Sequence, residues 1–310
     1  MNKDFISIHD ISLYEFHEIL DMAVRMKADP HHYHKALKNK VLAMIFQKPS
    51  LRTRMTFEVG MLELGGHAIY LSPSDGQVGA RESFYDVGKN LERWVHGIMI
   101  RTFAHQNIID LSAAVKIPVI NALSDLLHPC QAMADSFTLK EKVGNLSKLK
   151  LAYVGDGNNV CHSLMFAAAK AGCTMAVATP AGYEPSPDIV KLAREDGKDT
   201  GFSLSLTGDP RQAVTGAGAV YTDTWTSMGQ EAEKEARART FAPFQVNRGL
   251  MAQAKKDAFF MHCLPAHRGD EVTDEVMDSP SSLIFDQAEN RLHIQKVIMV
   301  LLMGKIEKNG

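Results

Sequence analysis

The segment VLAMIFQKPSLRTRMTFEVGMLELGG (41–66) joins a continuous apolar run to a helix-length stretch. The run 41–46 predicts a buried strand, because strands covered on both faces do not alternate with polar residues. Ser50 is a favoured helix-capping residue, and the paired glycines at 65 and 66 are a natural helix stop. The segment therefore predicts a strand, a short loop and a helix that ends at the glycines.

Similar apolar runs, separated by helix-length segments, recur through the chain. They lie at 67–72, 97–101, 117–121, 151–156, 174–180, 202–206, 219–224 and 258–263. Continuous apolar strands that alternate with helices predict parallel sheets covered on both faces. About nine strands are many for one sheet. We therefore expect an α/β protein of two domains, each a parallel sheet flanked by helices.

The polar segment EKVGNLSKLK (141–150) is the expected seam between the domains. We expect one domain at residues 1–142 and a second at 143–285. The last helix, at about 286–310, has a broad apolar face. This helix could pack on either domain, and packing back on the first domain is one possibility.

Composition excludes several classes of protein. The chain has 310 residues, 45% of them hydrophobic and 23% charged, as in a soluble globular protein. Its net charge of -2 gives no electrostatic reason to expect nucleic acid or an anionic membrane as a partner. The four cysteines are scattered, which argues against a disulfide framework or a zinc site and suits a reducing cytosol. We find neither a signal peptide nor an apolar run of roughly 20 residues, and expect a cytoplasmic protein.

The start of the helix after Ser50 is suited to an anion. A helix N-terminus presents unpaired N–H groups and a partial positive charge. Arg52 and the hydroxyls of Ser50 and Thr53 add donors that suit phosphate. The alternative is a plain helix cap followed by solvent-facing arginines.

Polar residues also follow later strands of the first half. Arg101 ends its strand, where ligands of open parallel sheets bind, although it could instead be a salt-bridge partner. His128 and Gln131 begin the next helix. Neutral His and Gln suit donation to a carbonyl oxygen that becomes negative in a transition state. The alternative for this pair is a capping His-Pro turn.

In the second half, VGDGNN (154–159) resembles a dinucleotide-binding loop but has Val160 in place of the third glycine. Asn159 is better interpreted as an amide that binds a ligand. Asp223 follows a strand and could pair with a cationic ligand or cap a helix.

Cys263 and Arg291 are the last candidates. Cys263 follows a strand, and a buried inert cysteine is the common case. Leu264 precedes Pro265, so its carbonyl can point inward, with a cis bond as one option. We expect Arg291 in the first turn of the last helix, where it needs an anion or a carboxylate such as Glu289.

Each motif is ambiguous, but their order along the chain is specific. Ser-x-Arg-Thr-Arg, a strand-end Arg, His-Pro-x-Gln, Asp-x-x-x-Ser-Met-Gly and His-Cys-Leu-Pro together resemble the aspartate/ornithine carbamoyltransferase family. The last two motifs are most similar to those of its ornithine-specific members. The resemblance runs from about Phe46 to the last helix.

This resemblance implies two sets of binding residues. The carbamoyl-phosphate set is Ser50, Leu51, Arg52, Thr53, Gln77, Arg101, His128, Pro129, Cys130, Gln131, Cys263, Leu264 and Arg291. The ornithine set is Asn159, Asp223, Ser227 and Met228. It implies catalytic roles for Arg101, His128 and Cys263.

Two positions in these sets have further implications. Leu51 stands where the family usually has Thr, which costs a hydroxyl but leaves the backbone donor. Gln77 matches a residue that reaches the site of a neighbouring subunit, which implies a homo-oligomer built on trimers.

The implied reaction needs neither a cofactor nor a metal and takes place in the cleft between the domains. The δ-amine of L-ornithine attacks carbamoyl phosphate, and a tetrahedral intermediate expels phosphate to give L-citrulline. Other acceptors in the family are N-acetylornithine, putrescine and aspartate. A nicotinamide-dependent oxidoreductase and a catalytically silent relative are the alternatives outside this reaction. The sequence leaves open whether the reaction serves arginine synthesis or citrulline breakdown.

Overall fold

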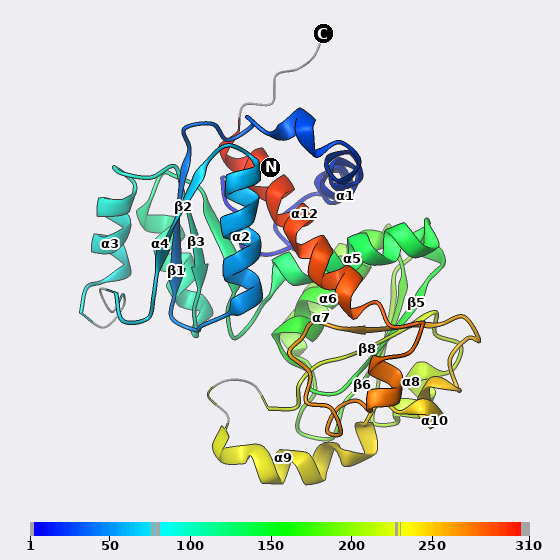
Figure 1. Cartoon of the computed structure of the whole chain (residues 1–310). Coiled ribbons are helices and arrows are strands. Elements are labelled where there is room, and N and C mark those ends of the chain that lie inside the picture. The colour runs from blue at the N-terminus through cyan, green and yellow to red at the C-terminus, as the bar shows by residue number, and fades with distance from the viewer. Residues whose placement is uncertain (1–2, 76–77, 79–80, 227–228, 230, 305–310) are drawn as a thin grey trace. The chain divides into compact units, whose positions relative to one another are not determined.

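A computed structural model describes residues 3–75, 78, 81–226, 229 and 231–304 of the chain (Figure 1). The chain forms two compact units. Unit 1 comprises Met1–Phe137 and Asn290–Gly310, and unit 2 comprises Thr138–Glu289. The predicted boundary at 142/143 lies at the end of helix α5, and the one at 285/286 lies in the first turn of helix α12.

Unit 1 contains a parallel sheet of order β2-β1-β3-β4. Its strands are β1 (Val41–Phe46), β2 (His67–Leu71), β3 (Gly97–Arg101) and β4 (Val119–Leu123). The other elements are α1 (Leu13–Ala28), the 3-10 turn η1 (Pro30–Tyr33), α2 (Leu51–Glu63), α3 (Phe84–Leu91), α4 (His105–Ala114), the start of α5 (Pro129–Val143) and most of α12 (Ile284–Met303). Strands β3 and β4 are buried along their whole length and β1 along all but its first residue, so the core lies around these three strands.

Unit 2 contains a parallel sheet of order β7-β6-β5-β8-β9. Its strands are β5 (Lys150–Val154), β6 (Thr174–Ala178), β7 (Ser203–Thr207), β8 (Ala219–Thr222) and β9 (Phe259–His262). Its helices and 3-10 turns are η2 (Leu146–Lys148), α6 (Asn159–Ala171), α7 (Pro187–Asp196), α8 (Pro210–Val214), η3 (Glu231–Glu233), α9 (Lys234–Phe241), η4 (Ala242–Phe244), α10 (Arg248–Met251) and α11 (Asp274–Met277).

These strands confirm the predicted fold class of two parallel sheets flanked by helices. β4 begins two residues later than expected, because Pro118 has no N–H to donate to a neighbouring strand. The predicted stop of α2 is also confirmed, since Gly65 follows the helix with a φ of 80°. No described helix has the length and apolar character needed to cross a membrane.

One sequence expectation about the last helix is wrong. Helix α12 begins at Ile284, so Arg291 lies in the middle of the helix rather than in its first turn. The helix starts earlier because "SLIF" continues its apolar pattern upstream of the expected start. The guanidinium of Arg291 hydrogen-bonds Thr53 of the same unit, at 2.7 Å.

In both sheets the chain reverses its direction of growth at an inner strand pair. In unit 1 this point lies between β1 and β3, and in unit 2 between β5 and β8. Open α/β sheets bind ligands outside the carboxyl ends of the strands at such a point. The fold therefore directs attention to the loops after these four strands.

Gly157 in the loop after β5 lies against the backbone of a neighbouring segment. A Cβ on this residue would come within 2.3 Å of Pro185 N and 2.5 Å of Glu184 C. The glycine thus permits a close backbone approach. This packing accounts for the glycine that gave VGDGNN its likeness to a dinucleotide-binding loop.

We expect Gly157→Ala to lower the free energy of unfolding by about 1–3 kcal/mol, because the backbone must shift to accept the methyl group. Gly208→Ala is the matched control, since a Cβ there meets nothing within 4 Å. Chemical denaturation of both variants beside the parent measures the difference. Equal stabilities for the two variants would contradict this account of the loop.

Candidate active site

In unit 1 the N-terminus of α2 is tied to α12 through hydroxyl groups. Ser50 caps the helix, and its Oγ accepts a hydrogen bond from Thr53 N at 3.3 Å. Thr53 Oγ1 accepts from Ser50 Oγ at 3.1 Å and from an Arg291 N–H at 2.7 Å. Thr53 and Arg291 are buried. The structure thus brings a buried guanidinium to the positive end of a helix, as an anion site requires.

The two arginines that follow Ser50 differ in their surroundings. Arg52 is half-buried in the first turn of α2. Arg54 hydrogen-bonds the exposed-face Glu58 at 3.0 Å, and its guanidinium lies 3.9 Å from the centre of the Tyr70 ring. Leu51 is 75% exposed, so its side chain adds nothing to the buried site. The prediction of solvent-facing arginines therefore suits Arg54 only.

Arg101 and His128 are buried in the same unit. Burial, reinforced by the positive charges of Arg291 and Arg101, holds the pKa of His128 well below its usual range. His128 is therefore neutral at pH 7. A neutral imidazole can donate one hydrogen bond without adding another positive charge to those of Arg101 and Arg291.

Cys130 and Gln131 lie in the first turn of α5. Burial raises the pKa of Cys130 to about 12, and its thiol donates to Asn121 O at 3.4 Å. Its side chain is thus a packing group rather than a reactive one. Gln131 donates from Nε2 to Asp135 Oδ1 at 2.8 Å. The amide carries a second N–H that can serve a ligand. Pro129 is the first residue of the helix.

Lys48 is a member of this group that sequence reasoning missed. It is buried, with its Nζ 4.3 Å from the centre of the Phe103 ring. Burial first and Arg101 second lower its pKa, and Asp125 opposes them. The available signal was its place between strand β1 and the Ser50 cap, because polar residues after an inner parallel strand face the ligand edge.

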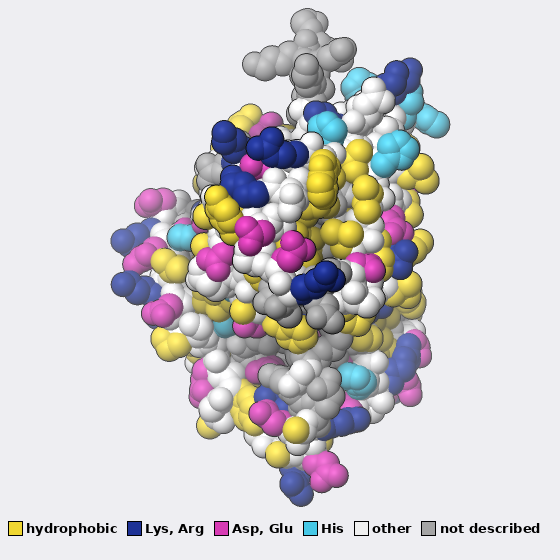
Figure 2. Space-filling model, turned by 90° about the vertical axis from the view of Figure 1, so that its left-hand side faces the viewer, with side chains coloured by type: hydrophobic (Ala, Val, Ile, Leu, Met, Phe, Trp, Pro, Cys, Tyr) yellow, Lys and Arg dark blue, Asp and Glu magenta, His cyan; other side chains and the backbone are white. Residues whose placement is uncertain are grey.

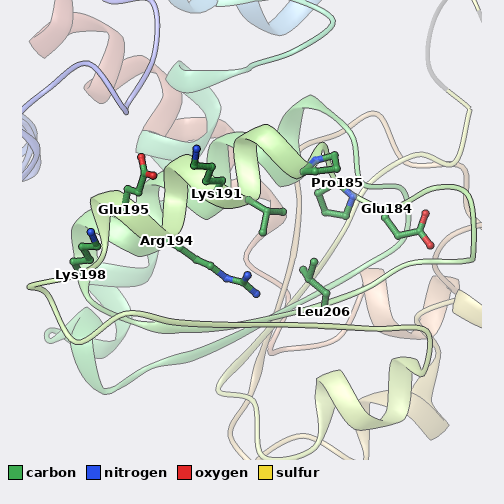
Figure 3. A pocket seen from close by; sticks show the side chains of 9 residues that line it. Glu184, Pro185, Lys191, Arg194, Glu195, Lys198 and Leu206 are labelled. Atoms are coloured by element: carbon green, nitrogen blue, oxygen red, sulfur yellow. The ribbon is translucent and has the colours of Figure 1, made fainter.

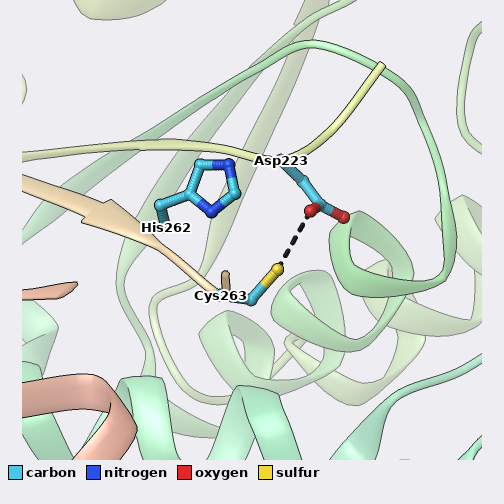
Figure 4. Close-up of side chains that lie close together, drawn as sticks. All are labelled: Asp223, His262 and Cys263. Carbon is cyan, nitrogen blue, oxygen red and sulfur yellow. Dashed lines mark hydrogen bonds between the residues drawn. The ribbon is translucent and has the colours of Figure 1, made fainter. Parts of the chain in front are cut away.

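In unit 2 a buried carboxylate follows β8. Asp223 Oδ2 accepts from Asn158 Nδ2 at 2.8 Å, and Oδ1 accepts from Thr224 N at 2.8 Å. Oδ1 also accepts from the thiol of Cys263 at 2.9 Å (Figure 4). Asp223 does not cap a helix, since the next described helix begins at Glu231. This geometry favours the interpretation of Asp223 as a partner for a cationic ligand.

Asn158 is the second residue that sequence reasoning missed. Its Oδ1 caps α6 by accepting from Val160 N and Cys161 N, while its Nδ2 reaches Asp223. A capping asparagine was recognisable before a helix that follows a strand. Asn159, the predicted ligand, is the half-buried first residue of α6.

Cys263 and Leu264 form the turn after β9. Leu264 has a φ of 58°, in the left-handed region, and the Leu264–Pro265 bond is cis. Leu264 N donates to His262 Nδ1 at 2.8 Å. The thiol of Cys263 is half-buried and held by Asp223, so it is an engaged group rather than an isolated buried cysteine.

Asp223, His262 and Cys263 could in principle hold a metal ion, because their ligand atoms lie within 4.8 Å of one another (Figure 4). Hydrogen bonds offer a different explanation for the arrangement of these side chains. His262 Nδ1 already accepts from Leu264 N, and the Cys263 thiol already donates to Asp223. We therefore interpret Asp223 and Cys263 as a hydrogen-bonded pair and His262 as the partner of Leu264, and assign no metal to the three.

Arg237 links two loops at this end of the sheet. It is buried, and its guanidinium hydrogen-bonds Asp156 and the carbonyl oxygen of Trp225. Its planar group also lies 4.7 Å from the centre of the Tyr183 ring. The loop before α6 and the segment after Asp223 thus share one cation.

A separate hollow of about 520 Å³ lies between α7 and the edge strand β7 (Figure 3). Arg194 extends from α7 toward the strand that carries Leu206. Lys191 and Lys198 also line the hollow. It contains none of the predicted site residues. Three further predicted residues, Gln77, Ser227 and Met228, lie outside the described residues.

The buried neutral His128 predicts a pH dependence of stability. Its pKa is lowered on folding, so below about pH 6.5 the unfolded chain binds a proton that the folded chain rejects. Stability therefore falls as the pH falls. Compared with His128→Gln, the parent should lose up to about 1.4 kcal/mol more per pH unit below pH 6.5. Denaturation at several pH values tests this, and above pH 7.5 the difference should stay constant.

Comparisons with known proteins agree with this arrangement. A family model described as the carbamoyl-P binding domain of aspartate/ornithine carbamoyltransferase matches residues 3–141. The Asp/Orn binding domain of the same family matches residues 147–302. The chain is 52% identical to the ornithine carbamoyltransferase of Thermococcus kodakarensis, over 98% of each chain.

Comparison with solved structures points to the same family. The ornithine carbamoyltransferase from Pyrococcus furiosus is 50% identical, with a TM-score of 0.95 over 98% of each chain. The ornithine transcarbamoylase from Giardia lamblia is 32% identical, with a TM-score of 0.90 over 99% of this chain and 100% of the other. The chain therefore belongs to the aspartate/ornithine carbamoyltransferase family.

Proposed function

We propose that the chain transfers the carbamoyl group of carbamoyl phosphate to the δ-amine of L-ornithine, giving L-citrulline and phosphate. The observation that carries this proposal is the division of charge between the two units. Unit 1 gathers Arg101 and Arg291 near a helix N-terminus, as a phosphate compound requires. Unit 2 presents the buried carboxylate of Asp223, as an amine substrate requires. Unit 1 is accordingly the carbamoyl-phosphate unit and unit 2 the ornithine unit.

Phosphate is held by the start of α2. The backbone N–H groups there, Arg52 and Arg291 supply charge-assisted hydrogen bonds. The same groups stabilise phosphate when it leaves. Leu51 in place of the family's Thr leaves the backbone donor in place, and its exposed side chain is compatible with that role.

The carbamoyl carbonyl is polarised by Arg101, His128 and Gln131. Its oxygen becomes negative in the tetrahedral intermediate, and donors fixed in advance stabilise that charge. Removing one such donor typically slows a reaction about 10²–10³-fold. The neutral state of His128 makes it a donor that keeps its proton through the reaction.

The amine must lose a proton before it attacks. Its reference pKa is about 10.4 by analogy with lysine, so the protonated form predominates at neutral pH. Asp223 attracts the ammonium group, and we place its deprotonation beside Asp223 and Cys263, whose thiol and carboxylate lie 2.9 Å apart. The free lone pair then forms the new C–N bond, the C–O bond to phosphate breaks, and the departing phosphate takes the proton that the nitrogen loses. Asn159, Ser227 and Met228 bind the rest of ornithine.

The relatives and the thiols suggest the setting. A relative from Pyrococcus furiosus, 50% identical, is described as anabolic, which favours the direction of arginine synthesis. All four cysteines lie in the described part of the chain and none is in a disulfide, which suits a reducing cytosol. We therefore propose cytoplasmic arginine synthesis as the setting.

Citrulline formation by purified protein tests the reaction. We expect turnover with carbamoyl phosphate and L-ornithine, and much less with N-acetylornithine, putrescine or aspartate. Arg52→Ala should lower kcat/KM by at least about 100-fold, because the phosphate loses a charged partner. Arg54→Ala is the matched control and should stay within about threefold, since Arg54 pairs with Glu58 and Tyr70.

Other outcomes separate the parts of the proposal. Turnover with a different amine alone would keep the carbamoyltransferase and overturn the ornithine assignment. A larger loss in Arg54→Ala than in Arg52→Ala would overturn the phosphate site. Folded protein without turnover on any acceptor would make the chain a silent member of the family.

We also propose a homo-oligomer built on trimers, as the match of Gln77 to an intersubunit residue implies. Exposed apolar side chains of unit 1 support it, among them Leu62 (72%), Trp94 (69%), Tyr85 (59%) and Ile69 (50%). Ile69 lies on the edge strand β2, which has an open side for a neighbour. Figure 2 shows apolar side chains among charged ones on the face it displays.

Analytical ultracentrifugation tests the assembly. We expect a species of three 34.2 kDa chains, or a multiple of three, at the protein concentration of the activity assay. On dilution, activity should fall as the oligomer dissociates, because the match assigns Gln77 to the active site of a neighbouring subunit. An active monomer would rule the assembly out.

A further inference from the structure

The turn after β9 depends on an imidazole acceptor. Leu264 has a φ of 58°, in the left-handed region that a residue with a side chain rarely adopts. Its N–H donates to His262 Nδ1 at 2.8 Å. The ring of His262 is fully buried, so this hydrogen bond is shielded from water. The ring nitrogen must be unprotonated to accept it.

The other ring nitrogen of His262 faces a carboxylate. Nε2 lies 3.3 Å from Glu271 Oε1, and both residues are fully buried. Glu271 Oε1 also accepts from His267 N, which fixes the carboxylate in place. When Nδ1 accepts, a neutral imidazole carries its proton on Nε2. That proton lies beside the carboxylate, whose negative charge favours a proton on Nε2 over one on Nδ1, so the two contacts favour the same tautomer.

Both neighbours of Cys263 are thereby held. His262 N donates to Gln287 Oε1 at 2.9 Å, and Leu264 N donates to the His262 ring. Between them, the Cys263 thiol donates to Asp223 at 2.9 Å. A change in the turn would therefore move the thiol relative to its carboxylate.

We propose that Glu271 is a positioning residue for this reaction. It keeps the proton of His262 on Nε2, so that Nδ1 holds the Leu264 N–H and the turn aims Cys263 at Asp223. With the other tautomer, the Nδ1–H of His262 would face the N–H of Leu264, and the hydrogen bond would be lost. The effect on turnover rests on the proposed function, whereas the effect on the turn does not.

Three variants separate this role from packing. Glu271→Met keeps the length of the side chain but removes both acceptors. Glu271→Gln keeps an oxygen acceptor for His262 Nε2 and His267 N. Glu275→Met is the control, since Glu275 lies on the surface and pairs with exposed Arg248.

We expect Glu271→Met to lower kcat about 10–100-fold, because misplacing a reacting group by about 1 Å costs up to this much. KM for carbamoyl phosphate should stay within about threefold. Glu271→Gln and Glu275→Met should each keep kcat within about threefold of the parent. Equal losses in Glu271→Gln and Glu271→Met would overturn the proposal, since the acceptor would not be the cause.

The rate of thiol labelling reports on the conformation of the turn after β9 and does not depend on enzyme activity. Cys263 is half-buried and the other cysteines are buried, so iodoacetamide should modify Cys263 first. We expect Glu271→Met to speed this labelling at least about threefold as the thiol leaves Asp223. An unchanged rate together with an unchanged kcat would overturn the proposal. Absent citrulline formation in the parent, by contrast, would refute the proposed function and leave the labelling result informative.

A double-mutant cycle tests the coupling. In His262→Asn, an amide oxygen can stand in for Nδ1, and no tautomer remains for Glu271 to select. Adding Glu271→Met to this background should change kcat less than about threefold. Independent, multiplying losses would contradict the assigned role.

The tautomer itself can be read in the parent protein, so a failure of Glu271→Met to fold leaves the proposal open to refutation. ¹⁵N chemical shifts of labelled histidine distinguish a protonated Nε2 from a protonated Nδ1. His262→Asn identifies the signal by its loss. Protonation of His262 at Nδ1 would overturn the proposal.

Discussion

Burial of the inner strands constrains where this chain can place polar chemistry. The inner strands β3 and β8 are buried along their whole length, and β1 and β5 along all but their first residue. Groups that must meet a ligand can therefore stand only where strands end. Parallel pairing brings those ends to one edge of each sheet, which is why residues far apart in sequence gather there.

The two units use this edge in opposite ways. Unit 1 collects cations around a helix N-terminus, and one hydrogen bond joins Thr53 to Arg291 across most of the chain length. Unit 2 surrounds a carboxylate with neutral donors, among them Asn158 and Cys263. Charge is thus divided between these two clusters, with cations in unit 1 and a carboxylate in unit 2.

The strands and helix α2 were predictable because their signals are local. Continuous apolar runs marked the strands, and Ser50 and Gly65 marked the ends of α2. Even the half-exposed edge strands β2 and β7 were found, because helix-length segments flank them. The joint order of the motifs gave the family, which no single motif could do.

The errors and omissions concern contacts that sequence spacing does not encode. Arg291 was expected in the first turn of the last helix, but α12 begins at Ile284, so the arginine lies in the middle of the helix. Asn158 was passed over for Asn159, because only the fold shows which amide meets Asp223. Lys48 was missed despite its place after an inner strand, because its environment arises from Arg101 and Phe103, both about fifty residues away.

The shared guanidinium of Arg237 has a mechanical consequence. It binds the carboxylate of Asp156 in one loop and the carbonyl of Trp225 in another. Breaking a buried ion pair by removing one partner costs about 3–5 kcal/mol, so displacing one loop alone is strongly opposed. The two loops are therefore expected to move together. A conformational change that displaces Trp225 would also displace the start of α6.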